Sequence, residues 1–316
     1  MSLMAATGLG GIVAATPTAR QRRLGAELHR LREQLDVTAE EVATRLGWSP
    51  SKLSRIENAR IGVRVSDVRL LLELYEVEEG HKGEILALAE AATRRGWWHR
   101  YQQVLPEQFA KFVALEAEAT SALAYATYTV PGLLQDEEYA RCTLESARAV
   151  TADTPREIST RVEVRMRRQQ LLLRKENPLK FDAIIDESVL LRTIGNRDVM
   201  RRQMRKLLSL TELPGVEIRV LPLGVHREPI VGESFILLKF GSADDDANTS
   251  SAVDEEDVNF TDVVYIDNSW MTAAEFLDDS LTYRYQRSWD ALKSAALSPD
   301  ESVLRISQLA RERWSE

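Results

Sequence analysis

Residues 37–59 read VTAEEVATRLGWSPSKLSRIENA, and they carry the clearest structural signals of the N-terminal part. Thr38 and the glutamate three residues later are typical of a capping box, in which a hydroxyl and a carboxylate accept hydrogen bonds from backbone amides at a helix start. Gly47 is expected to end this helix because glycine adopts the left-handed conformation at low cost. Ser49 and Pro50 suit the cap and first turn of a second helix. The stretch therefore predicts two short helices joined by a tight turn, a helix-turn-helix.

Apolar spacing on both sides of this motif predicts further helices. A preceding helix is expected to carry one face of leucines spaced three or four residues apart, namely Leu24, Leu28, Leu31 and Leu35. After the motif, Ser66 is expected to cap a fourth helix, and Ile85 lies in a fifth. The pattern predicts a compact domain of five helices over residues 19–92.

The motif resembles the helix-turn-helix of the xenobiotic-response-element-type (XRE) family, of the phage-repressor kind. The resemblance covers roughly residues 20–80, and it rests on Ala43, on the Leu46-Gly47 turn and on the run Leu53-Ser54-Arg55-Ile56-Glu57. It implies that the partner is double-stranded DNA and that the second helix of the motif enters the major groove. Many members carry a phosphate-contacting Gln where this chain has Ala39, and Thr38 and Thr44 are the candidates to replace it.

The second helix of the motif carries most of the predicted DNA contacts. Ser51, Lys52 and Arg55 are expected to point away from the buried side, so we assign base or phosphate contacts to them. Arg and Lys suit the O6 and N7 acceptors of guanine. The other residues predicted to bind DNA, several of them through phosphates, are Thr38, Ser49, Ser54, Asn58 and Arg60.

Charge agrees with a nucleic-acid partner for this part of the chain. Residues 20–64 contain ten Lys and Arg against six Asp and Glu, a balance of +4. The whole chain has 41 basic and 49 acidic residues, a formal charge of −8, which argues against a protein that coats nucleic acid over its entire surface. The alternative for the N-terminal domain is a helical bundle that contacts proteins and has solvated charges.

Residues 93–108 are interpreted as an aromatic linker between two domains. Trp97 and Trp98 are large apolar side chains that suit the docking of this linker onto the next domain. Stacking of the same rings on nucleic-acid bases is the alternative.

Residues 109–316 predict a second domain, with helices first and a mixed sheet after them. Residues 109–150 are expected to form helices with one break at residues 130–135, with Ala122 and Tyr125 on a helical face before the break and Asp136 as the cap of the helix after it. A long helix is predicted from Pro155 through Lys175. A helix near 198–210 and closing helices accompany predicted strands at 181–185, 216–221, 235–240 and 263–266. The predicted fold is mainly α with a smaller α+β part.

This second region resembles the C-terminal domain of antitoxin-like XRE regulators of actinomycetes. The resemblance rests on an ordered series of short motifs that includes Gly96-Trp97-Trp98, Val130-Pro131-Gly132-Leu133-Leu134-Gln135, Arg168-Gln169, Val220-Leu221-Pro222 and Val264-Tyr265-Ile266. It implies a transcription regulator without enzyme activity. Genes for such regulators often lie beside a gene for a small acidic protein, the implied partner.

The residues expected for catalysis or metal binding do not occur in suitable patterns. Cys142 is the one cysteine, and no two of the four histidines are spaced for zinc. Asp186 and Glu187 are adjacent, so on a strand they would point to opposite faces; one of them is expected to cap the following helix. His226, in a predicted loop between strands, is read as solvated, with ligand contact as the alternative. We therefore predict no enzyme, no cofactor and no metal.

Two segments are expected to lack regular structure. Residues 1–18 are small and apolar without Lys or Arg, which favours a disordered leader over a signal peptide. Residues 241–259 hold seven acids and no base, which indicates a solvated loop; binding of a basic partner or shielding of a sheet edge are the alternatives.

The sequence thus predicts a sequence-specific, DNA-binding transcription regulator that acts as a homodimer. The second domain would bind a partner protein or an effector and support dimerisation, since two-fold symmetry doubles the contacts made by one helix-turn-helix. The alternatives are an antitoxin-like protein that mainly binds a small acidic partner, with DNA binding for autoregulation, and an enzyme with a DNA-targeting domain. No run of about 18 apolar residues occurs, and a cytoplasmic, nucleoid-associated protein is expected.

Overall fold

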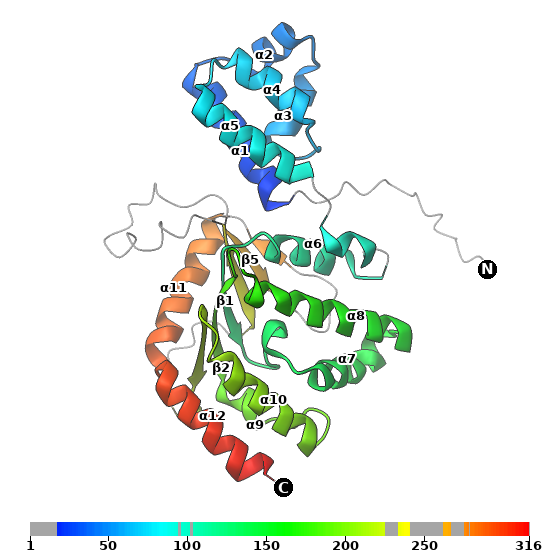
Figure 1. Ribbon diagram of the computed structural model, residues 1–316, viewed down its shortest axis with the longest axis vertical. Helices are drawn as coiled ribbons and strands as arrows, with labels where there is room; N and C mark the ends of the chain where they lie inside the picture. The colour runs from blue at the N-terminus through cyan, green and yellow to red at the C-terminus, as the bar shows by residue number, and fades with distance from the viewer. Residues whose placement is uncertain are drawn as a thin grey trace, which may run out of the picture. The chain divides into compact units, whose positions relative to one another are not determined.

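The computed structural model divides the chain into two compact units, Met1–Arg95 and Gly96–Glu316 (Figure 1). It describes residues 18–93, 96–101, 104–224, 233–240, 262–266, 275–277 and 279–315. Within these ranges, no helix is both long enough and apolar enough to span a bilayer. The predicted leader (except Thr18), the acidic loop 241–259 and the loop with His226 lie outside the described residues.

The first unit is a helical bundle over residues 18–93, and its order agrees with the five predicted helices. They are α1 (Ala19–Gln34), α2 (Ala39–Leu46), α3 (Pro50–Glu57), α4 (Val65–Leu74) and α5 (Glu79–Thr93). A capping box at Thr38 starts α2, and Gly47 ends it with a left-handed φ of 67°, as predicted. The core is formed by side chains from all five helices, among them Leu24, Leu28, Val42, Leu53, Leu71, Leu72 and Ile85.

Two predictions for this unit are wrong at helix ends. Leu35 does not continue the buried face of α1: it is the C-cap residue and is 46% exposed. Ser66 does not cap α4, because the helix begins one residue earlier, at Val65, with Arg64 in the cap position. Thus α1 ends before the last leucine of its apolar pattern, and α4 begins before the predicted cap.

The second unit is built on a sheet with strand order β3-β2-β1-β4-β5-β6. β1 (Ser121–Ala126), β2 (Lys180–Asp186) and β3 (Val216–Leu221) are parallel, whereas β4 (Phe235–Lys239), β5 (Val263–Ile266) and β6 (Glu275–Leu277) pair antiparallel. Parallel neighbours require crossover connections, and helices supply them. The helices of this unit are α6 (Glu107–Glu116), α7 (Glu137–Thr151), α8 (Pro155–Arg168), α9 (Glu187–Leu191), α10 (Arg197–Leu210), α11 (Asp279–Ala295) and α12 (Pro299–Trp314).

The predicted strands correspond to β2, β3, β4 and β5, and the predicted break before α7 and its Asp136 cap are confirmed. The prediction of helix at Ala122 and Tyr125 is wrong. Both residues belong to β1, which lies at the centre of the sheet, and all six residues of this strand are buried. A strand covered on both faces shows no alternation of polar and apolar residues. Its alanines also have a high helix propensity, which favours the wrong prediction.

The helix predicted to reach Lys175 ends at Arg168 and continues as a 3₁₀ turn, Gln169–Leu173.

Helices cover both faces of this sheet, as Figure 1 shows for α11 on one side and α8 on the other. Trp289 and Leu292 of α11 pack in one core with Val264 and Ile266 of β5. Tyr265 lies between Val264 and Ile266 along β5, so its side chain points to the other face of the sheet. There its ring stacks on Phe112 of α6 with centroids 4.0 Å apart.

The aromatic segment Trp97–Tyr101 forms a 3₁₀ turn within this second unit, and Trp98 is buried.

Candidate nucleic-acid interface

The α2–α3 pair has the geometry of a helix-turn-helix, with the left-handed Gly47 in the turn and Pro50 in the first turn of α3. Leu53 and Ile56 are buried on one side of α3. The opposite side presents exposed side chains, which include Ser51, Ser54, Arg55 and Asn58. An eight-residue helix thus offers a polar face to the solvent.

The exposed side chains of α3 lie along the helix and hydrogen-bond to its own carbonyls. Arg55 Nε donates to the Ser51 carbonyl at 3.0 Å, and Asn58 Nδ2 donates to the Ser54 carbonyl at 2.8 Å. The hydroxyls of Ser49 and Ser51 lie 3.3 Å apart at the N-terminal end. In the described part of the chain, no contact involves the two terminal nitrogens of Arg55. Arg55 is exposed, so its two terminal nitrogens are accessible to a ligand.

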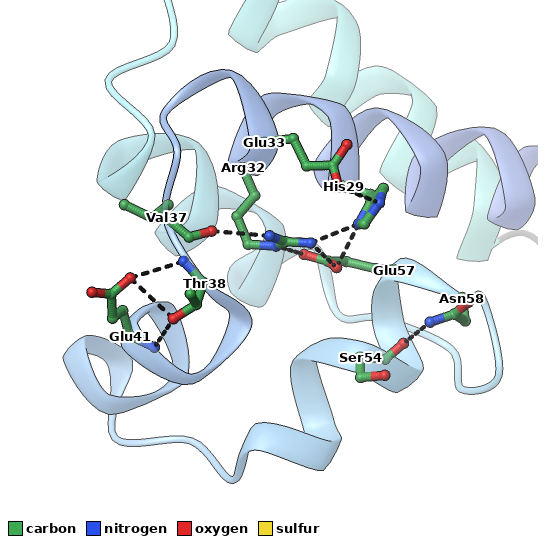
Figure 2. Close-up of polar contacts among 9 residues, drawn as sticks. All are labelled: His29, Arg32, Glu33, Val37, Thr38, Glu41, Ser54, Glu57 and Asn58. Atoms are coloured by element: carbon green, nitrogen blue, oxygen red, sulfur yellow. Dashed lines mark hydrogen bonds and ion pairs between the residues drawn. The ribbon is translucent and has the colours of Figure 1, made fainter.

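Three other predicted contact residues lie in different surroundings. Thr38 is engaged in its capping box: its hydroxyl accepts from the Glu41 amide at 3.2 Å and donates to the Glu41 carboxylate at 3.0 Å (Figure 2). Arg60 is exposed in the loop after α3, next to Ala59 with a φ of 52°. Lys52 does not extend into the solvent, because its Nζ lies 3.0 Å from Asp67 Oδ2 of α4.

A buried carboxylate at the end of α3 holds this helix against α1 (Figure 2). The side chain of Glu57 is 5% exposed, and Arg32 Nε of α1 lies 2.8 Å from one of its oxygens. The same guanidinium donates to the other oxygen at 3.1 Å and to the Val37 carbonyl at 2.9 Å. His29 Nδ1 lies 3.0 Å from the carboxylate. Hydrogen bonding to Glu57 raises the pKa of Arg32.

Backbone packing adds to this junction between α1 and α3. A methyl group at Gly25 would lie 2.3 Å from the Glu57 carbonyl oxygen, so only glycine allows α1 to approach this closely. Sequence reasoning did not find the cluster of His29, Arg32 and Glu57. Arg32 and His29 precede Glu57 by 25 and 28 residues, and no rule of sequence spacing predicts contacts between residues on separate helices. The one available signal was an acid beside the buried Ile56.

The charge around α3 is positive. Residues 45–69 contain six Lys and Arg and two Asp and Glu. Both acids are paired, Glu57 with Arg32 and Asp67 with Lys52. The remaining cations are exposed, and they are Arg45, Arg55, Arg60, Arg64 and Arg69. Such a surface suits the phosphates of a nucleic acid.

In the second unit, the residues considered for chemistry have structural partners. Asp186 caps α9 by accepting from the Ser188 amide at 3.0 Å, which confirms the predicted cap. Glu187 accepts from the Leu223 amide at 3.0 Å. Burial raises the pKa of the Cys142 thiol, so this group is not an activated thiolate. No cluster of potential metal ligands occurs in the described residues.

Comparison with known families gives two matches along the chain. Residues 23–82 match the family described as "Helix-turn-helix domain". Residues 109–308 match the family described as "Domain of unknown function (DUF5753)". No curated protein and no solved structure is significantly similar to the chain. The first match covers the unit that carries α2 and α3, and such a domain is typical of DNA-binding regulators.

Proposed function

The chain belongs to the family of the domain of unknown function DUF5753, and we propose that it is a transcription regulator whose helix-turn-helix reads an operator in double-stranded DNA. The observation that carries this proposal is the exposed face of α3, on which Arg55 lies together with Ser51 and Ser54. An arginine of this kind can donate two hydrogen bonds to the O6 and N7 atoms of one guanine. The two acids of residues 45–69, Glu57 and Asp67, are each paired with a cation, so their charges repel phosphates less.

For the second unit, we propose binding of a partner protein or an effector, together with support of a homodimer. The XRE-type and antitoxin-like resemblances favour this division of labour. One helix of eight residues makes few base contacts, and a two-fold dimer would place two copies on half-sites about one helical turn apart. We propose a regulator rather than an enzyme, located in the cytoplasm with the nucleoid. The second candidate is an antitoxin-like protein whose main partner is a small acidic protein.

The experiment that tests the function is selection of bound DNA. The purified protein is incubated with fragmented genomic DNA from its source, and the retained fragments are sequenced. We expect a shared palindromic site that Arg55→Ala loses. Arg311→Ala removes the same charge from an exposed position in the second unit and should keep the site. Absence of any enriched site in the wild type would contradict operator reading, and co-purification of a partner would then favour the second candidate.

The loss in the Arg55 variant should depend on sequence. If Arg55 reads a base, Arg55→Ala weakens binding to the selected site by about 1–3 kcal/mol and relaxes the preference at one position. Binding to random DNA of the same length should change little. An equal loss on both DNAs would show that Arg55 contacts only a phosphate.

A further inference from the structure

The ammonium group of Lys52 joins α3 to the turn before it and to α4. Lys52 belongs to α3, and its Nζ lies 3.6 Å from the ring centroid of Trp48 in the turn before that helix. The same atom lies 3.0 Å from the Asp67 carboxylate on α4. The Lys52 side chain is 30% exposed and that of Asp67 is 20% exposed, so the ion pair is sheltered from the solvent. A cation over a tryptophan face and beside a carboxylate is attracted by both.

This contact lies at the end of α3 that otherwise has few polar ties. The side chain of Ser49, the N-cap residue, makes no capping hydrogen bond with the helix backbone, and its hydroxyl lies 3.3 Å from that of Ser51. At the opposite end, Glu57 is fixed by Arg32 from α1. A short helix held at one end can still turn about that end. The Lys52–Asp67 pair supplies a second attachment, to a different helix, near the other end.

We propose that Lys52 is a positioning residue: by binding Asp67 and Trp48, it fixes the angle at which α3 presents Ser51 and Arg55 to the bases. The inference rests on the function proposed above and names which residues of α3 read the operator. Lys52 then contributes to operator recognition through the orientation of its neighbours. It makes no phosphate contact of its own.

The alternative is that Lys52 leaves its partners when DNA binds and contacts a phosphate. That movement would leave the Asp67 carboxylate beside the DNA without its cation. It would also give up the contact with the Trp48 ring. The two possibilities predict opposite effects for the loss of Asp67, because a lysine released from Asp67 is a better phosphate ligand.

The test measures binding to the selected operator and to random DNA at several salt concentrations. It compares the wild type with Lys52→Met, Asp67→Asn, the double variant and the exchanged pair Lys52→Asp/Asp67→Lys. We expect each single variant to bind the operator about 3–10-fold more weakly, which corresponds to about 1 kcal/mol. The double variant should be no weaker than the single ones, and the exchanged pair should regain part of the loss. Random-DNA affinity and the salt slope should stay unchanged.

A readout without DNA separates this inference from the proposed function. Hydrogen exchange of the α3 amides should be faster in Lys52→Met and Asp67→Asn than in the wild type, by a similar factor. Tighter operator binding by Asp67→Asn, or a salt slope reduced by about one phosphate contact in Lys52→Met, would overturn the inference. Unchanged exchange and unchanged operator binding in both variants would also overturn it. If the wild type selects no operator, the proposed function fails, while the exchange data still decide whether the pair holds α3.

Discussion

Arg32 links the two helices whose relative position fixes the candidate DNA-binding face. Its side chain is 11% exposed, and the Glu57 carboxylate that it binds is 5% exposed. Removal of one partner from a buried ion pair leaves the other charge buried and unpaired. The free energy lost in this way is larger than the net stabilisation that the intact pair provides. The pair is therefore expected to matter for the stability of the first unit and, through α3, for DNA binding.

Arg32→Met is expected to destabilise the first unit by about 2–3 kcal/mol. This is less than the cost of a buried carboxylate with no partner at all, because His29 still contacts Glu57. Arg30→Met is the matched control, since Arg30 is 50% exposed and pairs with Glu27 on the surface of the same helix. It should cost at most about 1 kcal/mol. Hydrogen exchange of the slowest amides in α1–α5 measures both values. Equal losses would show that burial of the Glu57 pair has no special cost.

The stability of the first unit is expected to depend on pH through His81. His81 of α5 lies 2.8 Å from Glu27 of α1 and 3.3 Å from Glu84, and hydrogen bonding to these carboxylates, first of all Glu27, raises the pKa of His81. The folded unit therefore holds this proton more tightly than the unfolded chain. The resulting stabilisation is complete below the unfolded pKa of about 6.5 and is lost as the pH rises through the folded value.

The unfolding free energy of the first unit should thus fall between about pH 6 and pH 8 more steeply in the wild type than in His81→Asn. The difference between the two proteins isolates His81 from the other titrating groups. Parallel pH profiles would contradict the contribution of this pair. At lower pH, Glu27 acts in the opposite sense: hydrogen bonding, chiefly to Arg30, lowers the pKa of Glu27, so its contribution is lost on acidification.

At the scale of elements, local signals in the sequence were sufficient for the helix-turn-helix. Thr38, Gly47 and Pro50 act through contacts within a few residues, and the structure has the cap, the left-handed turn and the helix start there. β1 could not be predicted in this way. Its identity as a strand depends on β2 and β4, which pair with it from 54 or more residues further along the chain. The partners of Glu57 and Lys52 were hidden for the same reason.

The edge strand β3 is hydrogen-bonded to the start of α12 and to the residue before its cap. Its Val220 amide donates to Ser302 Oγ of α12 at 2.9 Å, and the Val220 carbonyl accepts from the Leu297 amide at 2.9 Å. The start of α12 and the residues before it therefore occupy hydrogen-bonding groups that an exposed edge would offer to another chain. Ser302 is fully buried, so its hydroxyl cannot be replaced by water without rearrangement.

Ser302→Ala should destabilise the second unit by about 1–3 kcal/mol, because it leaves the Val220 amide buried without an acceptor. Ser307→Ala, on the same helix and half-buried, should stay within about 0.5 kcal/mol of the wild type. Denaturant unfolding followed by the fluorescence of the tryptophans measures both. A loss no larger in Ser302→Ala than in Ser307→Ala would mean that another group takes over the amide.

At the scale of the whole molecule, the chain has separate cores. Among the described residues, one cluster contains side chains from 24–92, and two clusters of the second unit contain buried side chains from 123–292. The formal charge of −8 is likewise uneven, since the cations around α3 stand in an otherwise acidic chain. Each unit can therefore be perturbed in its own core, and the effects can be compared in the full-length protein.

Leu71→Ala in the first unit and Leu237→Ala in the second remove side chains that are 0% exposed, and each should cost its unit about 2–5 kcal/mol. In calorimetry of the full chain, we expect each variant to lower the midpoint of one transition and to leave the other in place, because each cavity lies in one core. Leu70→Ala, next to Leu71 but 44% exposed, should leave both midpoints within about 2 °C. If both core variants shift one common transition, the two units unfold as one, and changes in the second unit would then reach the DNA-binding face through stability alone.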